Sequence, residues 1–384
     1  MRDPVSIAQA LLRCPSVTPR DCGAQDVLQS LLESVGFTVH RLTFSEPGTS
    51  DVDNTYARFG AQSPNLCFAG HTDVVPPGEE SEWTYPPFGA EIHGGVIYGR
   101  GAVDMKGAIA CFVAAAARSI ERRGGLRGSV SLLITGDEEG AAINGTSKVL
   151  NWLVAQEEKL DACLVGEPSC PSRIGDMIKI GRRGSVTAHI AVQGKQGHAA
   201  YPQLADNPVP KLARIIDRLS SISIDSGSDA FEPSRLQFTL ISVPNTAANV
   251  IPGHARATLN VRYNDNWTRP KMEAWIREQC HAAAESVDAH FDLAFEGTGD
   301  VFLTKPGGQL VDATIAAVQS VTGLVPKLST SGGTSDARFI QAYCPVIELG
   351  LVNKTIHQID ECCPVDHMHQ LTSIYERLIE GYFA

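Results

Sequence analysis

The sequence predicts an α/β protein, in which a mostly parallel twisted sheet is flanked by helices and a smaller α+β unit with ferredoxin-like element order is inserted. Apolar runs at 66–70, 128–136 and 161–166 alternate with helical patterns, which is typical of buried parallel strands. Residues 186–194, 236–243 and 255–263 instead alternate apolar and polar side chains, as antiparallel strands with one buried face do. We therefore expect a large domain in two segments, 1–179 and 298–384, with an inserted domain at 180–297.

The first segment begins with apolar residues at helical spacing, and it continues as alternating strands and helices. A Pro- and Gly-rich loop interrupts this alternation and is too long to be an idle connection. We expect helices at 5–14, 23–35, 108–123 and 146–159, strands at 37–44, 66–70, 128–136 and 161–166, and the functional loop at 74–107.

The inserted segment follows the order β-α-β-β-α-β, with helical segments near 206–221 and 268–287 and a last strand near 290–296. An open sheet of this kind has exposed edges, so the pattern favours a homodimer formed through it. The final segment returns to the first texture, with a helix near 308–321, the Gly-rich TSGGTSD, a strand at 344–350 and a C-terminal helix.

Composition narrows the class of partner. The chain has 384 residues, a formal net charge of -11 and a pI near 5.5, which argues against nucleic acid or an anionic membrane surface. No apolar run approaches the ~18 residues that a membrane span needs. The ten cysteines form no CxxC pair, and the adjacent Cys362 and Cys363 are interpreted as packed or solvated thiols. These features favour a cytoplasmic protein that acts on small molecules.

Polar residues gather where the predicted core strands end. His71 and Asp73 follow the first strand, Glu138 and Glu139 the second, and Glu167 the third. Because ligands bind outside the carboxyl ends of such strands, we expect these side chains to lie together. The alternative is that they are solvated turns, since paired acids are usually exposed.

Two further residues extend this set: Asp104 can reach the same edge from its loop, and His357 lies in a polar loop after a core strand. Carboxylates this close to one another raise each other's pKa unless cations are present, and a pair of divalent metals would resolve the conflict. Histidine with carboxylate suits zinc, and sites with two metals typically serve hydrolysis.

Ordered motifs along nearly the whole chain resemble the dinuclear zinc aminoacylase/carboxypeptidase family. They are GHTDVVPPG, GRGAVDMKG, the DEEG turn, CLVGEPS, GRRGS, GHAAYP and TSGGTSD. The resemblance implies a zinc-exopeptidase-like domain with an inserted dimerisation lid, and a hydrolase of N-acyl amino acids. Two Zn²⁺ per subunit are implied, with Co²⁺ able to substitute at one site.

The resemblance also implies roles for single residues. Asp104 would bridge the metals, His71 and Glu167 would complete one site, and Glu139 and His357 the other. Glu138 would be the general base and Asp73 the partner of His71. His198 would reach into the active site of the partner chain.

Substrate contacts are implied as well. In GRRGS, Arg182 is the candidate for binding a carboxylate through two hydrogen bonds, although the run could also be a solvated basic turn. The resemblance supplies the other candidates at matching positions: Ser185, Asn249, Arg262, Gly333 and Thr334. This chain departs from the family pattern at Ala248, where relatives usually carry an asparagine that could contact substrate. A non-catalytic metal-binding scaffold is the alternative from another functional class.

Overall fold

A computed structural model describes residues 2–123 and 126–384, and they divide into two compact units. The first unit runs to Ile180 and resumes over Thr304–Ser329 and Ser335–Ala384, and the second comprises Gly181–Leu303 and Thr330–Thr334. The second unit extends past 297 because β16 (Phe302–Leu303) pairs with β9 (Gly181–Arg182). It includes Thr330–Thr334 because the Thr330 hydroxyl donates to the carbonyl of Ala230 at 2.6 Å.

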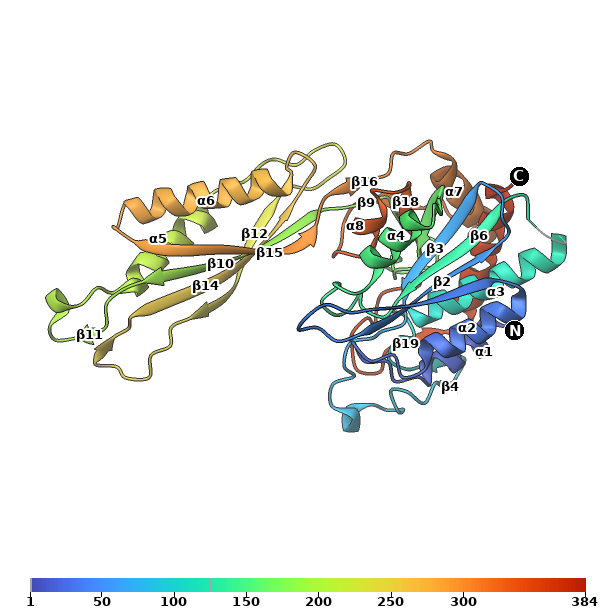
Figure 1. Cartoon of the computed structure of the whole chain (residues 1–384), viewed down its shortest axis with the longest axis horizontal. Helices are drawn as coiled ribbons and strands as arrows, with labels where there is room; N and C mark the ends of the chain where they lie inside the picture. Colours follow the sequence, from blue (N-terminus) through green and yellow to red (C-terminus); the bar gives the residue numbers. More distant parts are fainter. Residues whose placement is uncertain (1, 124–125) are drawn as a thin grey trace. The chain divides into compact units, whose positions relative to one another are not determined.

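The first unit is built on a sheet with the strand order β1-β2-β6-β3-β7-β18-β8-β17 (Figure 1). The central strands β6, β3, β7 and β18 are parallel to one another, and β1 and β2 run antiparallel at one edge. The predicted fold class, with its mostly parallel sheet, is therefore confirmed. The strands are β1 (Thr38–Phe44), β2 (Val52–Phe59), β3 (Asn65–His71), β6 (Ser129–Thr135), β7 (Ala162–Val165), β8 (Met177–Lys179), β17 (Lys327–Ser329) and β18 (Val346–Glu348).

Helices cover both faces of this sheet. Phe68 of β3 stacks on Phe112 of α3 with ring centroids 4.3 Å apart, and its ring also meets Tyr375 of α9. On the opposite face, Tyr56 of β2 lies against Trp152 of α4 at 6.1 Å. The helices are α1 (Pro4–Leu12), α2 (Ala24–Val35), α3 (Lys106–Arg123), α4 (Thr146–Ala155), α7 (Gln309–Thr322), α8 (Ala337–Ile340) and α9 (Val365–Tyr382).

The long loop after β3 has secondary structure of its own. It contains the short helical turn η1 (Glu80–Glu82) and the strands β4 (Glu91–His93) and β5 (Val96–Tyr98). β5 pairs with β19 (Cys362–Pro364), which comes more than 250 residues later. This small sheet joins the loop to the segment just before α9.

The second unit has the element order and the strand order of a ferredoxin-like fold. Its sheet runs β12-β14-β10-β15, and every neighbouring pair is antiparallel (Figure 1). Val186 and Ile190 of β10 pack with Leu212 of α5 and Ile276 of α6 in a separate core. The elements are β10 (Gly184–Gln193), β11 (Gly197–His198), η2 (Pro202–Leu204), α5 (Pro208–Ser221), β12 (Arg235–Ser242), β13 (Val250–Ile251), β14 (His254–Tyr263), α6 (Arg269–Glu285) and β15 (His290–Gly299).

None of the helices in the described residues combines the length and the apolar character that crossing a membrane requires.

Candidate metal centre

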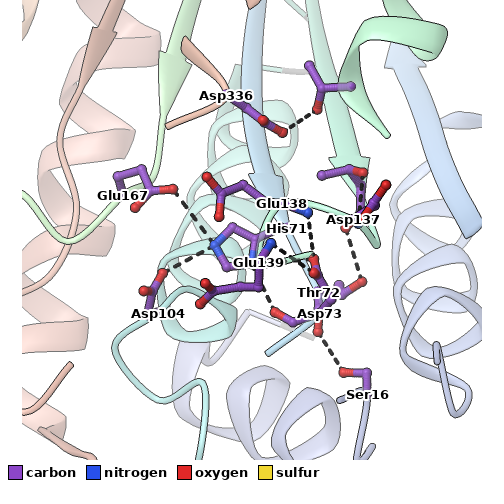
Figure 2. A network of polar contacts seen from close by, with 12 residues as sticks. Ser16, His71, Thr72, Asp73, Asp104, Asp137, Glu138, Glu139, Glu167 and Asp336 are labelled. Atoms are coloured by element: carbon purple, nitrogen blue, oxygen red, sulfur yellow. Dashed lines mark hydrogen bonds and ion pairs between the residues drawn. The ribbon is translucent and has the colours of Figure 1, made fainter. Parts of the chain in front are cut away.

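Three parallel strands deliver polar side chains to one edge of the sheet. β3 is buried along its whole length and ends at His71, which pairs with Thr135 at the end of β6. Glu138 and Glu139 follow β6, and Glu167 follows β7. Figure 2 shows these side chains and Asp104 directed toward one another. The structure thus brings together the residues that the sequence predicts to meet here.

A first ligand cluster consists of His71, Asp104 and Glu167. Nε2 of His71 lies 3.2 Å from Oδ1 of Asp104 and 3.7 Å from Oε1 of Glu167 (Figure 2). One ligand atom from each residue lies within 4.8 Å of the others. One imidazole and two carboxylates at this spacing form a suitable donor set for zinc.

A second ligand cluster consists of Asp104, Glu139 and His357, again with ligand atoms within 4.8 Å of one another. Nε2 of His357 lies 3.1 Å from Oδ2 of Asp104 and 2.9 Å from Oε1 of Glu139. Asp104 therefore presents one carboxylate oxygen to each histidine. A carboxylate in this position can bridge two cations.

Asp73 supports the site in a different way from the one expected. The nearest acceptor to Nδ1 of His71 is the backbone carbonyl of Asp73, at 2.9 Å, whereas its carboxylate oxygen is 3.6 Å away. The carboxylate instead accepts hydrogen bonds from the backbone N–H groups of Glu138 and Glu139, at 3.3 and 3.0 Å. Asp73 thus orients the imidazole through its main chain and holds the turn after β6 through its side chain.

The electrostatics of the cluster reflect burial and crowding. Burial raises the pKa of Glu138 to about 8, and the charges of Asp336, Glu139 and Asp104 act in the same direction, against His71. Burial and neighbouring carboxylates also raise the pKa of Glu167 well above its usual range. Such groups lie this close only where positive charge compensates them.

The same carboxylates favour the protonated, positively charged forms of the two histidines. Hydrogen bonds to Asp104 and Glu139 raise the pKa of His357 to about 10. Burial opposes protonation of His71, but its contacts with Asp104 and Asp73 outweigh burial and raise the pKa. Because metal ligands bind in their deprotonated forms, divalent cations would replace these protons as the compensating charge. The donor set therefore fits a pair of metals.

Several buried acids near the site were not predicted. Asp336 accepts a hydrogen bond from the Thr146 hydroxyl at 2.6 Å, and its charge contributes to the raised pKa of Glu138 (Figure 2). Glu348 accepts a hydrogen bond from the Ser335 hydroxyl at 2.5 Å. Asp336 ends the TSGGTSD motif, so its place after a Gly-rich turn was a usable signal. Glu361 is a further buried acid, and the sequence around it contains no motif that would indicate a role.

The candidates for substrate binding lie in the second unit and fall into two groups. Near the start of β10, Ser185 pairs across the sheet with Arg262 of β14, and Thr334 lies beside Gly299 of β15. Arg182 is buried, and its Nη1 donates to the carbonyl of Ser331 at 3.2 Å. Gly333 lies in the same short segment as Ser331 and Thr334. This group gathers two arginines, two hydroxyls and the backbone of Gly333 at one end of the sheet.

His198 and Asn249 lie at the other end. His198 is exposed in β11, where it pairs with Val250, and the carbonyl of Asn249 accepts from the N–H of Ala199 at 2.9 Å. β10 separates this tip from Ser185, and its rise of ~3.3 Å per residue makes the separation about 25 Å or more. Within one copy of the unit, the two groups are not brought together.

The sequence is similar to a known family and to named proteins over nearly its whole length. The model of peptidase family M20/M25/M40 matches residues 67–381. A protein named succinyl-diaminopimelate desuccinylase from Rhodospirillum centenum is 54% identical over 382 residues, covering 100% of this chain and 98% of the relative. A protein of the same name from Bradyrhizobium sp. is 54% identical over 386 residues and covers 100% of both chains.

Solved structures show the same fold at much lower identity. The M20 family metallo-carboxypeptidase Sso-CP2 from Sulfolobus solfataricus superposes with a TM-score of 0.82 at 19% identity, covering 100% of this chain and 99% of the other. A Bacillus subtilis protein described as a dinuclear metal binding peptidase from the M20 family gives 0.73 at 16% identity, covering 98% and 96%.

Proposed function

This chain belongs to peptidase family M20/M25/M40, and from that premise we propose that it is a succinyl-diaminopimelate desuccinylase. It would hydrolyse the amide bond of N-succinyl-LL-2,6-diaminopimelate to give succinate and LL-2,6-diaminopimelate, in diaminopimelate and lysine biosynthesis. Relatives of that name match at 54% identity over essentially the full chain. The observation that carries the chemistry is Asp104, whose two carboxylate oxygens each face a different histidine.

We assign two divalent metals to the ligand clusters, Zn²⁺ at both or Co²⁺ at one of them. His71, Asp104 and Glu167 would hold the first, and Asp104, Glu139 and His357 the second. When bound, such ions polarise the amide carbonyl and lower the pKa of water toward ~7.

Glu138 is the proposed general base. It lies beside both clusters on a turn fixed by Asp73, and its side chain is directed to the same space as the ligands (Figure 2). Its carboxylate would take a proton from the attacking water and pass it to the leaving amine. Glu138 also lies within ligand distance of His71 and Glu139, so metal content must be measured alongside activity when it is replaced.

The substrate carries several carboxylates, and the second unit offers matching cations. Arg182 and Arg262, with Ser185 and the segment containing Gly333 and Thr334, are the proposed contacts at one end of its sheet. A guanidinium group binds a carboxylate through two parallel hydrogen bonds, which gives both affinity and orientation.

We further propose a homodimer in which His198 and Asn249 act in the active site of the partner chain. Two features support it: these residues lie at the end of the sheet opposite to Ser185, and β12 is an edge strand. On β12, Leu240 and Ile241 are 58% and 59% exposed, and an edge that exposes large apolar side chains favours pairing with another chain. We place the enzyme in the cytoplasm, where its cysteines, all free thiols in the structure, would stay reduced.

A dimer with shared sites can be tested by complementation. His198→Ala chains mixed with His71→Ala chains should regain activity, because half of the sites in a mixed dimer then combine intact ligands with an intact His198. A verified mixed dimer without activity would contradict the shared site.

The rival functions differ in the acyl group. An N-acetylornithine deacetylase, an aminoacylase or a carboxypeptidase could use the same metal cluster, and this chain has Ala248 where the family resemblance implies an asparagine. The test is to supply zinc and compare release of succinate from N-succinyl-LL-2,6-diaminopimelate with release of acetate from N-acetylornithine. We expect the succinylated substrate to have the higher kcat/KM, and a preference for acetate release would assign the rival function. Stoichiometric zinc without hydrolysis of any N-acyl amino acid would instead indicate a non-catalytic scaffold.

A further inference from the structure

Glu361 is fully buried close to the ligand clusters and has no role in the scheme above. Its Oε1 accepts hydrogen bonds from the backbone N–H groups of Val103 and Asp104, at 2.8 and 3.1 Å. Its Oε2 accepts from the N–H of Gly101 at 3.0 Å and from Nη1 of Arg100 at 2.8 Å. Four donors on one carboxylate use nearly all of its acceptor capacity.

The main chain of Glu361 continues this arrangement, because its carbonyl accepts from the N–H of Gly99 at 2.9 Å. One residue thus holds the whole segment from Gly99 to Asp104. The segment has no regular secondary structure and ends at the aspartate that both ligand clusters share. Its path is therefore fixed mainly by hydrogen bonds to Glu361, together with the bond from the N–H of Arg100 to the carbonyl of Pro87 at 2.8 Å, rather than by a strand or a helix.

Arg100 links Glu361 to the surroundings. It is 2% exposed, its guanidinium lies 5.3 Å from the centre of the Trp83 ring, and Nη2 approaches the carbonyls of Pro76 and His357 at 3.4 and 3.5 Å. The indole N–H of Trp83 in turn donates to the carbonyl of Pro77 at 3.0 Å. Arg100 is therefore fixed on several sides, and so is the carboxylate that it pairs with.

His357 and Glu361 are joined by a short turn. Asp360 in this turn is hydrogen-bonded to Thr84, which lies in the same long loop after β3 as Asp104. Both oxygens of Asp360 accept from Thr84, at 2.7 and 2.8 Å, and His357 and Asp360 both have positive φ angles, +59° and +58°. A displacement of Glu361 would therefore move Asp104 through its N–H and His357 through the connecting turn.

The other ligands are held independently of Glu361. His71 is the last residue of β3, Glu167 lies two residues after the end of β7, and both strands are hydrogen-bonded to neighbours on either side. Of the second cluster, in contrast, Asp104 and His357 both lie on irregular chain. The two clusters thus differ in what determines their geometry.

We propose that Glu361, paired with Arg100, is a positioning residue that sets the spacing of Asp104 and His357 and so determines affinity at the second metal position. The inference rests on the proposed dinuclear function. A buried ion pair is weak evidence of a contribution to stability, since apolar residues of similar volume often stabilise as well. The placement of this pair, on the N–H of a shared ligand, gives it a specific role instead.

The test is metal binding by the full-length protein after chelation. Co²⁺ is titrated into wild type and Glu361→Gln, and binding is followed by calorimetry and by the visible absorption of the bound Co²⁺. Wild type should show a tight and a weaker binding step. In Glu361→Gln the weaker step should lose about 10- to 100-fold in affinity, as is usual when a residue supporting a metal ligand is lost. The tight step, assigned to the cluster with His71 and Glu167, should change much less, because Asp104 is the one member of that cluster whose backbone Glu361 holds.

Glu376→Gln is the matched control. Glu376 is also a buried carboxylate of the first unit, paired with Arg122 and Arg118, but it lies on α9 and holds no segment that carries a ligand. It should leave both binding steps as in wild type. If Glu361→Gln weakens both steps equally, or neither, the proposal is wrong.

Arg100→Lys provides a second variant should Glu361→Gln fail to fold. It keeps the charge but loses the planar fork and the stacking on Trp83, so the weaker step should again be affected selectively, to a smaller extent. An unchanged weaker step in Arg100→Lys would overturn the pairing. If wild type itself binds a single Co²⁺, the dinuclear centre of the proposed function is wrong, which separates that failure from the failure of this inference.

Discussion

The proposed metal ligands and the proposed substrate contacts are organised differently. The ligands and Glu138 belong to the first unit and lie within a few ångströms of one another at one sheet edge. The substrate candidates belong to the second unit and divide between the two ends of its sheet. Within the first unit, strand ends bring distant residues together, whereas within the second a long strand keeps Ser185 and His198 apart.

This difference indicates how each set can work. The proposed ligands all come from one chain, because both ligand clusters consist only of residues of the first unit. The proposed substrate contacts lie at opposite ends of the sheet of the second unit. They can contact one small substrate together only if a second element, such as another copy of the chain, brings the two groups close. We therefore expect changes in the first unit to affect chemistry and metal, and changes in the second to affect recognition.

The largest expected effect comes from the first unit. Glu138→Gln should lower kcat by about 10²- to 10⁴-fold, because it removes the proton acceptor while keeping the shape of the side chain. Zinc content, measured by atomic absorption, should stay normal. Glu139→Gln is the matched control and should lower metal content instead. Near wild-type turnover by Glu138→Gln would exclude Glu138 as the base.

A recognition residue of the second unit should produce the next largest effect. Arg182→Ala should lower kcat/KM on the succinylated substrate by about 100-fold or more, since losing one charged contact in a desolvated pocket costs about 2–5 kcal/mol. Zinc content should not change. An acetylated analogue should be penalised less if Arg182 contacts the succinyl carboxylate, and equally if it contacts the amino-acid end.

The adjacent Arg183 supplies the control for that measurement. Its guanidinium approaches Glu232 at 4.0 Å, and Arg183→Ala should change kcat/KM much less. Equal losses in the two variants would point to a general effect of the basic run, and an unchanged kcat/KM in Arg182→Ala would remove this residue from the site.

Metal removal should separate the two units by stability. At a free metal concentration about 100 times Kd, binding stabilises the folded state by about 2.7 kcal/mol, and this gain should belong to the first unit. Calorimetric scans with and without chelator should show a first-unit transition that shifts by a few degrees, beside a second-unit transition that does not. Equal shifts of both transitions would show that the units unfold together.

The smallest expected effect concerns acid stability of the second unit. Asp225 accepts hydrogen bonds from Asn264 at 2.6 Å, from the Trp267 indole at 2.8 Å and from the backbone N–H groups of Gly227 and Ser234 at 2.8 and 3.1 Å. Burial alone would raise its pKa, but these bonds outweigh burial and lower the pKa to about 2. A lowered folded-state pKa stabilises the unit above pH ~4 and loses this effect as pH falls toward ~2.

Asp225→Asn should therefore destabilise the second unit by about 1 kcal/mol at pH 6 and by much less near pH 2. Urea unfolding at both pH values measures this difference. Asp217→Asn on the exposed face of α5 is the control and should have little effect at either pH. A destabilisation independent of pH would show that the charge of Asp225 is not what stabilises the loop.

The sequence predicts the edge of the sheet that carries the ligands because buried parallel strands have a clear apolar signal. His71 and Glu167 lie at or just after the ends of such strands, so their meeting can be inferred from topology. β2 lacks the signal and was not predicted. Its Asn54 is buried, and the side-chain amide N–H groups donate to the carbonyls of Leu42, Val52 and Asn144, so a polar residue occupies a strand interior.

Glu361 could not be identified from spacing or residue type. An isolated acid looks the same in sequence whether it is solvated or accepts four hydrogen bonds from a loop 260 residues away. The observed boundary of the second unit also differs from 180–297, because β16 joins the unit through short strand pairing and Thr330–Thr334 joins it through side-chain hydrogen bonds, not through an apolar pattern. Long-range polar contacts of this kind leave no local periodicity.

The order of the proposed ligands along the chain also determines when each ligand cluster can form during translation. During translation, most of the proposed ligands are made before the second unit. The ligand His357 and the positioning residue Glu361 are made after it. The core contact between Phe112 of α3 and Tyr375 of α9, with ring centroids 5.6 Å apart, likewise forms only after α9 has been made. Until residue 357 has been made, the carboxylates of the proposed ligand clusters are therefore present without the imidazole of His357. The second ligand cluster can therefore assemble only after residue 357 has been made, and a chain that ends earlier lacks both its histidine and α9.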